Sequence, residues 1–391
     1  MKGIGQTDAI LDGEQADFAV EALGKELKTE WIVEALQATG RDSIRLRLLP
    51  ARFVIWFMIL LGLYRRVSYS NLLEKVVGSF WTDAHWPQEC PPTTSALTKA
   101  RDRLGVEPVR HLWQRSAREW VDGTSGLIFH GRRVRAIDGS TCKTADLLEN
   151  CRHFGKPGAS RGRPAYPQMR TALLVDIGQR LICGERHGPY STSEIQMARE
   201  LLQQVEPGSL VLMDRNFVDY EFLWDLHTRG ADFLVRIPKK IKPSLVKRLS
   251  PGDAIVEVQI PRYYQKLRPD MPHTWTLRMI SYCPAGGKET IRLFTTLVHE
   301  TDIGKEEFAA LYHERWEEET VIDELKTHLC GCQTVNQAVM FRSRTPARVE
   351  QEWYGLLLAF NAVRKTMSTA AQTANVCPRR LSFTAALERL R

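Results

Sequence analysis

The spacing of apolar residues divides the chain into a helical first third and a mixed remainder. Residues 1 to about 130 contain few stretches that alternate with period two, and they predict helices over 14–39, 50–63, 68–80, 94–104 and 106–121. After residue 131, short apolar runs indicate strands over 133–141, 171–177, 180–188, 209–214 and 232–238. Helices are predicted over 191–205 and 219–229. This order predicts an α/β domain whose mixed sheet carries helices on its faces.

The segment from about 238 to 300 has a different pattern. It starts with a basic run and continues with β-prone segments over 254–260, 274–282 and 289–298, so we expect a β-rich insertion. A long amphipathic helix over 347–367 follows the Pro346 break, and a short helix ends the chain.

Composition and charge narrow the function only loosely. The chain has 391 residues and a net charge of +8, which permits a polyanionic partner without establishing one. Its eight cysteines include no CxxC pair, so reduced thiols in the cytoplasm are the expectation. The apolar stretch 53–63 is too short to cross a bilayer and predicts a buried core helix. We therefore expect no membrane partner.

The segment 311–329, LYHERWEEETVIDELKTHL, contains no Pro or Gly and predicts one continuous helix from about residue 305. At about 100° per residue, four polar side chains fall within an arc of roughly 60° beside an apolar stripe. These residues are Tyr312, Arg315, Glu319 and Lys326. The nearby Glu314, Glu317, Glu318 and Glu324 are predicted to point elsewhere. A carboxylate in this arc could bind a metal ion while the Arg and Lys side chains bind a neighbouring phosphate. The alternative is an ordinary charged helix face exposed to solvent.

The order Tyr, two residues, Arg, three residues, Glu, six residues, Lys resembles the Y-(2)-R-(3)-E-(6)-K motif of the IS4-family transposases, and all four residues match its spacing. The resemblance covers about 133–367 well and the first third more loosely. It implies a DDE active site on an RNase H-like core, with a β-rich insertion and an all-α N-terminal domain. The implied division is a helical DNA-binding domain over 1–130 and a catalytic domain over 131–391. The insertion then falls at about 238–300 and the C-terminal helices at about 347–391.

A DDE site requires two upstream aspartates on strands, and Asp138 and Asp214 meet this requirement as the predicted last residues of their apolar runs. The stretch DRNFVDY around Asp214 also resembles the family's pattern. Taken singly, each aspartate could instead belong to a turn or a cap. Asp176 and Asp219 are the alternative choices. With Glu319, the resemblance implies that Asp138 and Asp214 hold two Mg²⁺ ions, for which Mn²⁺ can substitute.

The expected activity is that of a DNA transposase: binding the terminal inverted repeats of its element, cutting at the ends and joining the 3′-hydroxyls to target DNA. Synapsis implies a homodimer on double-stranded DNA, in the cytoplasm and associated with the nucleoid. The alternatives are an inactive or domesticated DNA-binding protein and a Mg²⁺-dependent nuclease without strand transfer. The sequence leaves open whether cleavage passes through a hairpin.

Further DNA contacts are expected from basic residues. Within the motif, Tyr312, Arg315 and Lys326 would contact phosphates. The loop 151–170 contains several cations and no acid, and we predict DNA contacts from its Arg161 and Arg163, a flexible linker being the alternative. In the first third, the basic helix 94–104, with Lys99, Arg101 and Arg103, is compatible with DNA binding or with an ordinary helical bundle. Trp275 is a candidate to hold a flipped base, although core packing is the expected fate of an insertion Trp.

Overall fold

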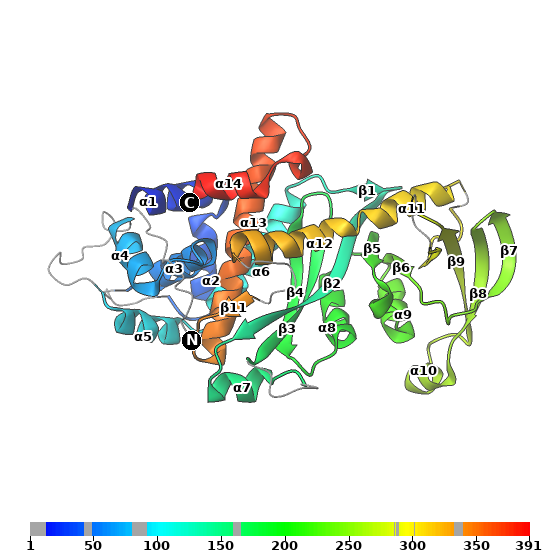
Figure 1. Ribbon diagram of the computed structural model, residues 1–391, viewed down its shortest axis with the longest axis horizontal. Coiled ribbons are helices and arrows are strands. Elements are labelled where there is room, and N and C mark those ends of the chain that lie inside the picture. The colour runs from blue at the N-terminus through cyan, green and yellow to red at the C-terminus, as the bar shows by residue number, and fades with distance from the viewer. Residues whose placement is uncertain are drawn as a thin grey trace. The chain divides into compact units, whose positions relative to one another are not determined.

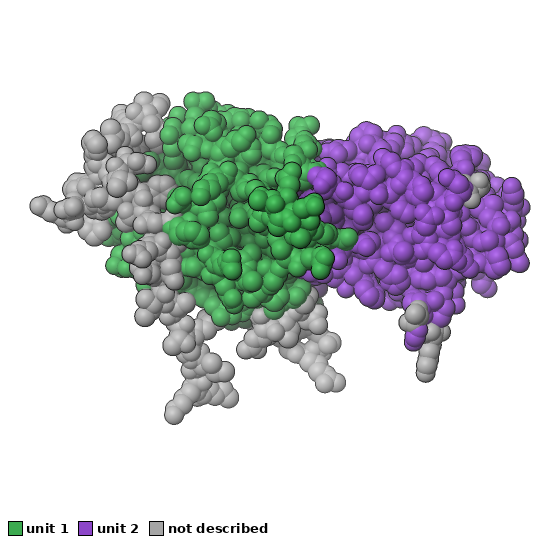
Figure 2. Space-filling model, turned by 90° about the horizontal axis from the view of Figure 1, so that it is seen from above, with its two compact units in different colours: residues 1–124, 141–169, 322–391 green, residues 125–140, 170–321 purple. Residues whose placement is uncertain are grey.

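Figure 1 shows the computed structural model, which describes residues 13–42, 49–79, 92–158, 166–284, 286, 289–300, 302–331 and 339–391. The chain forms two compact units, coloured separately in Figure 2. Unit 1 comprises Met1–Thr124, Thr141–Met169 and Ile322–Arg391, and unit 2 comprises Ser125–Ser140 and Arg170–Val321. The domain boundaries expected from the sequence stay a prediction.

Unit 1 is built mainly from helices. Those of the first third are α1 (Gly13–Glu26), α2 (Thr29–Ala38), α3 (Ala51–Leu63), α4 (Tyr69–Ser79), α5 (Thr94–Leu104) and α6 (Glu107–Asp122). The helices α7 (Leu148–Phe154), α13 (Pro346–Thr373) and α14 (Phe383–Leu390), with the short η4 (Pro378–Arg380), also belong to it. The predicted helix 14–39 is two helices, because the backbone at Lys28 is extended. Helix α7 lies in a segment for which we predicted none.

The apolar helix α3 is the core of unit 1. Every residue from Phe53 to Leu63 is buried, which confirms the predicted core helix. A Cβ on Gly62 would lie 2.7 Å from the carbonyl oxygen of Gly355 in α13, so the two helices approach as closely as glycine allows. Among the described residues, no helix combines the length and the apolar character that a membrane span requires.

A mixed sheet organises unit 2. Its longer strands are β2 (Arg132–Thr144), β3 (Gln168–Asp176), β4 (Leu181–Pro189), β5 (Ser209–Met213), β6 (Asp232–Arg236), β7 (Ser244–Ser250), β8 (Asp253–Gln259), β9 (Thr274–Tyr282) and β10 (Ile291–Thr295). The short strands β1 (Ile128–Phe129) and β11 (Val339–Phe341) pair with β2. The main order is β4-β3-β2-β5-β6-β10-β9-β8-β7.

Strands β2, β5 and β6 run parallel, and the insertion adds β10, β9, β8 and β7 as an antiparallel extension beyond β6. The fold class predicted from the sequence, an RNase H-like mixed sheet with a β-rich insertion and a helical N-terminal region, is confirmed. The basic run after residue 238 contributes a strand that we did not predict, the edge strand β7.

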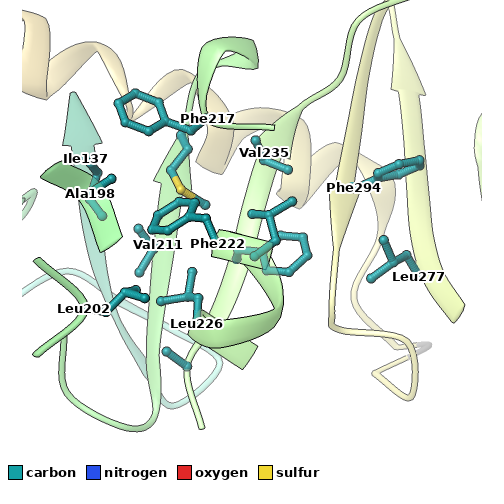
Figure 3. Packing of buried hydrophobic residues seen from close by; sticks show 14 of the residues in the cluster. Ile137, Ala198, Leu202, Val211, Phe217, Phe222, Leu226, Val235, Leu277 and Phe294 are labelled. Atoms are coloured by element: carbon teal, nitrogen blue, oxygen red, sulfur yellow. The ribbon is translucent and has the colours of Figure 1, made fainter. Parts of the chain in front are cut away.

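Helices cover both faces of the central strands. One face packs on α8 (Glu194–Leu201), η1 (Leu202–Gln204), η2 (Arg215–Phe217) and α9 (Tyr220–Thr228), with Val211 of β5 turned toward them (Figure 3). Met213 of β5 belongs to the same hydrophobic cluster. The other face packs on α11 (Lys305–His313), with Leu210 and Leu212 of β5 turned toward it. This alternation is the two-residue period of a strand buried on both sides. The small helix α10 (Arg262–Leu267) belongs to the insertion.

The segment predicted as one continuous helix is interrupted. It consists of α11, α12 (Trp316–Asp323) and a π-helical turn, η3 (Glu324–Leu329), with Glu314 and Arg315 in a turn between the first two. Backbone N–H groups across this turn donate to the carbonyl three residues earlier, as in the bond from Glu318 to Arg315 of 3.0 Å. The prediction of an unbroken helix is therefore wrong.

Candidate active site

Two carboxylates stand next to each other on the central parallel strands. The register of β2 and β5 pairs Ile137 with Met213, so the next residues are Asp138, within β2, and Asp214, directly after the end of β5. Neighbouring strands are about 4.8 Å apart. By the two-residue alternation, both aspartates continue the sheet face on which α11 packs. The parallel pairing thus unites acids that are far apart in sequence.

Each aspartate is anchored by the backbone. Asp138 Oδ1 accepts a hydrogen bond of 2.7 Å from the N–H of Gly139. Asp214 Oδ1 accepts a hydrogen bond of 2.7 Å from the N–H of Asn216 and thereby caps η2. A capping role was the alternative considered for this aspartate in the sequence analysis. Asp138 lies inside its strand, since β2 runs from Arg132 to Thr144, so the expectation that this aspartate comes last in its strand is wrong.

The electrostatic environment of Asp138 disfavours its charged form. Burial raises the pKa of Asp138 to about 6, and repulsion from Asp214 and Glu194 acts in the same direction. The N–H of Gly139 and the guanidinium of Arg315 oppose this shift. A perturbed carboxyl beside other acids is typical of functional sites.

Tyr312 and Arg315 connect the helical segment to the strand ends. The Tyr312 hydroxyl donates to the carbonyl of Met213 at 3.3 Å, and burial raises the pKa of this tyrosine to about 12. Arg315 donates to Glu319 at 2.7 Å, and its Nη1 lies 4.0 Å from Asp138 Oδ2. Its guanidinium also faces the Tyr312 ring at 5.9 Å. Two of the motif's side chains therefore lie within contact distance of the aspartates' strands.

The two glutamates at the centre of α12 have opposite environments. The Glu319 side chain is 54% exposed and is held by Arg315. Glu318 is completely buried, and neither of its carboxylate oxygens has a hydrogen-bond partner among the described residues. Burial raises the pKa of Glu318 well above its ordinary value, and the charges of Asp138 and Asp214 add to this effect. Glu318, which the sequence analysis left outside the arc of the motif residues, is thus close enough to the two aspartates for their charges to act on it.

The helical interruption explains this outcome. Turns closed by bonds three residues apart advance about 120° per residue, whereas an α-helix advances about 100°. The turn at Glu314 and Arg315 therefore shifts the rotation of α12 relative to α11, so the directions of Glu318 and Glu319 differ from those on an uninterrupted helix.

A further acid lies beside Asp138 and was missed by sequence reasoning. Glu194 opens α8, and its side chain lies against Gly139, where a Cβ would come within 2.8 Å of Glu194 Oε1. Small size at position 139 therefore leaves room for this carboxylate. No motif marked Glu194, because its proximity depends on how α8 packs against β2.

The donor atoms suit a hard divalent cation, although no close-packed ligand set is formed. Among the described residues, no group of three or more His, Cys, Asp and Glu side chains is arranged to hold a metal ion. The acids that gather here nevertheless supply carboxylate oxygens, the ligands that Mg²⁺ prefers. The unpartnered oxygens of Glu318 and the mutual repulsion of the carboxylates are what a cation would relieve.

Other predicted contact residues have varied locations. Lys326 lies in η3 and is 8% exposed, so it is not the solvated surface charge that we considered as its alternative. Arg161 and Arg163 lie outside the described residues.

Arg101 in α5, from the predicted basic helix of the first third, is 4% exposed and donates to the Ser343 hydroxyl at 3.0 Å and the Arg348 carbonyl at 2.8 Å. It is therefore not part of an exposed basic face.

Asp176 and Asp219, the alternative candidates for metal ligands, form hydrogen bonds that stabilise the fold. Asp176 is buried and accepts hydrogen bonds from Arg133 at 2.6 Å and Arg135 at 2.9 Å. Asp219 caps α9 and accepts a bond of 2.7 Å from Arg199. These partners account for both carboxylates without a catalytic role.

Trp275 is 6% exposed and belongs to the hydrophobic cluster of β8, β9 and α9, where its ring lies 5.3 Å from that of Trp224. Core packing, the expected alternative, is its role here.

Comparison with known proteins gives consistent matches. The family model described as "Transposase DDE domain" matches residues 129–362, and "Insertion element 4 transposase N-terminal" matches 18–114. "Transposase InsG for insertion sequence element IS4" of Escherichia coli K12 is 28% identical over 93% of this chain and 80% of its own. "Putative transposase InsZ" of the same strain is 27% identical over 64% of this chain and 81% of its own. A piggyBac transposase synaptic complex with hairpin DNA has a TM-score of 0.46 at 11% identity, covering 95% of this chain and 79% of that one.

Proposed function

Because the chain belongs to the IS4 family of DDE transposases, we propose that it binds the terminal inverted repeats of its own element, cleaves at the ends and joins the 3′-hydroxyls to target DNA. The support for DNA ends as substrate comes from the family. The support for phosphoryl transfer comes from the acids gathered on one sheet face.

The proposed metal ligands are Asp138, Asp214 and Glu319. When bound, two Mg²⁺ or Mn²⁺ ions would activate water or a 3′-hydroxyl and neutralise charge on the leaving oxygen. The strands hold the two aspartates in fixed register, and Arg315 links Glu319 to Asp138, with its guanidinium 2.7 Å from the glutamate and 4.0 Å from the aspartate. No side-chain nucleophile is required, so these residues act by position and charge.

The cations of the motif have a complementary role in this proposal. Arg315 balances part of the acidic charge through Glu319 and Asp138, and its remaining donors suit a phosphate. Lys326 would contact DNA phosphate from η3. Tyr312, whose hydroxyl is bound to Met213, positions the helical segment that carries them.

One observation carries the proposal: the parallel register sets Asp138 beside Asp214, on the face that the helical segment covers. The residues matched by the N-terminal family model, 18–114, are the proposed recognition region. Arg161 and Arg163 are proposed to add DNA contacts, and a homodimer is proposed to hold two ends together.

The test uses end DNA and a target plasmid. Glu319→Gln should abolish cleavage of end DNA in Mg²⁺ while leaving end binding largely intact. Glu306→Gln is the control, because that glutamate is 79% exposed at the start of α11. Near-normal nicking by Glu319→Gln would remove this residue from the site.

A second assay supplies pre-cut ends, since only a transposase joins them to the plasmid. Cleavage without joined products would favour a Mg²⁺-dependent nuclease, and binding without cleavage would favour an inactive DNA-binding protein.

A further inference from the structure

Glu318 is the buried acid that the motif-based assignment leaves unused. Its side chain is fully buried, and both carboxylate oxygens lack a hydrogen-bond partner among the described residues. Buried carboxylates are normally paired with a cation or hydrogen-bonded, since an isolated charge in the interior is costly. This glutamate therefore needs a hydrogen-bond or ligand partner that the described part of the chain does not supply.

The surroundings of Glu318 indicate the charge of that partner. Asp138, Asp214 and Glu319 all repel it, and Arg315 is the cation that acts on it. Arg315 is already engaged, with a bond of 2.7 Å to Glu319 and an approach of 4.0 Å to Asp138. A further positive charge at this place would reduce the repulsion among the carboxylates of Asp138, Asp214 and Glu318.

The backbone holds Glu318 in this direction. The bonds three residues apart before α12 rotate it toward the sheet, and the Tyr312 hydroxyl fastens the preceding helix to the Met213 carbonyl. Glu319 is turned outward instead, with its side chain 54% exposed. The orientation is thus a property of the folded segment and does not follow from the motif's spacing.

We propose that Glu318 is an additional carboxylate ligand of the divalent-cation site formed with Asp138 and Asp214. This inference rests on the proposed function and adds a residue outside the family motif. Its oxygens provide the hard ligands that Mg²⁺ or Mn²⁺ takes. A bound cation would give the buried carboxylate the opposite charge that it lacks.

The experiment measures Mn²⁺ binding to the full-length protein without DNA, by the loss of the free-ion electron paramagnetic resonance signal. Glu318→Gln should weaken Mn²⁺ binding by at least about tenfold, the lower end of what lost metal-site support costs. Glu317→Gln is the matched control, because the adjacent glutamate pairs with Arg180 and should leave Mn²⁺ affinity unchanged.

Thermal unfolding of the same variants separates ligation from folding. Metal-free Glu318→Gln should unfold at a temperature equal to or above that of the wild type, since a buried carboxyl group without a hydrogen-bond partner among the described residues has been replaced by a neutral amide, while the Mn²⁺-induced rise shrinks. If this variant does not fold, Glu318→Asp, which keeps the carboxyl group but shortens the side chain, should also bind Mn²⁺ more weakly.

The outcomes distinguish this inference from the proposed function. If Asp138→Asn and Asp214→Asn weaken Mn²⁺ binding while Glu318→Gln and Glu318→Asp do not, the role of Glu318 is overturned and the two-aspartate site stands. If the wild-type protein binds no Mn²⁺, both proposals fail.

Discussion

The Tyr312 hydroxyl donates a hydrogen bond of 3.3 Å to the carbonyl of Met213, the residue immediately before Asp214. The tyrosine belongs to α11 and the carbonyl ends β5, so one bond connects the helical segment to the strand that carries the second aspartate. With 6% of its surface exposed, Tyr312 makes this contact in the interior, where an unpaired carbonyl would be costly.

Tyr312→Phe should lower the free energy of unfolding by about 1 kcal/mol, because one buried hydrogen bond is lost while the ring remains. Cleavage of end DNA should also slow, since the helical segment loses its attachment next to Asp214. Denaturant unfolding and cleavage assays measure the two effects. Tyr263→Phe is the control, because Tyr263 is 66% exposed and should change neither. A Tyr312→Phe protein as stable as the wild type would show that the bond contributes nothing.

Asp138 should make the metal-free protein less stable as pH rises. Its pKa is about 6 in the folded protein and 3.8 in its ordinary state, so between these values the folded chain binds more protons than the unfolded chain. The unfolding free energy therefore falls through this window and levels off above it. The contribution is on the order of 3 kcal/mol at most, from 1.36 kcal/mol per pKa unit.

Asp138→Asn provides the comparison. With metal removed by a chelator, the stability of this variant relative to the wild type should be smallest near pH 4 and increase until about pH 6 to 7. Urea unfolding across this range measures it. A difference that does not vary with pH would argue against a raised pKa at Asp138.

Arg278 should be the strongest single determinant of stability in the insertion. It is 1% exposed, pairs with Asp253 through bonds of 2.9 and 2.6 Å, and donates to the carbonyls of Glu300 and Ile303 ahead of α11. Arg278→Met should cost about 3–5 kcal/mol, because it leaves a buried carboxylate unpaired. Adding Asp253→Leu should recover part of this loss, as measured by denaturant unfolding. Arg268→Met, at a 28% exposed arginine, should cost far less, and equal costs would refute the assignment.

Lys326→Ala should weaken binding of end DNA and reduce its dependence on salt. A lost phosphate contact lowers the slope of log K against log salt by about 0.9. Fluorescence anisotropy over a series of NaCl concentrations measures this slope. Lys25→Ala, at a lysine that is 70% exposed and paired with Glu21, is the control. An unchanged slope for Lys326→Ala would count against a phosphate contact.

Much of the fold was predictable because it depends on local pattern. The apolar runs around Asp138 and Asp214 predicted their strands, and the two-residue period places both side chains on one face once the strands pair in parallel. The motif spacing led to the helical segment, which lies within the residues that the DDE-domain family model matches. The edge strand β7 was not predicted, because lysine has low β-strand propensity and the basic run gives no clear strand pattern.

By itself, the sequence determined which segments are strands and helices, and it brought forward the acids and cations of the site, because periodicity and motif spacing are properties of neighbouring residues. Only the tertiary structure decided which glutamate faces the aspartates. The turn at 314–315, with its bonds three residues apart, interrupts the helix and changes its rotational phase, and in the folded segment Glu318 is buried while the Glu319 side chain is exposed. Packing of α11 on the sheet, including the bond from Tyr312 to Met213, accompanies that shift, and no spacing rule for an ideal helix contains it.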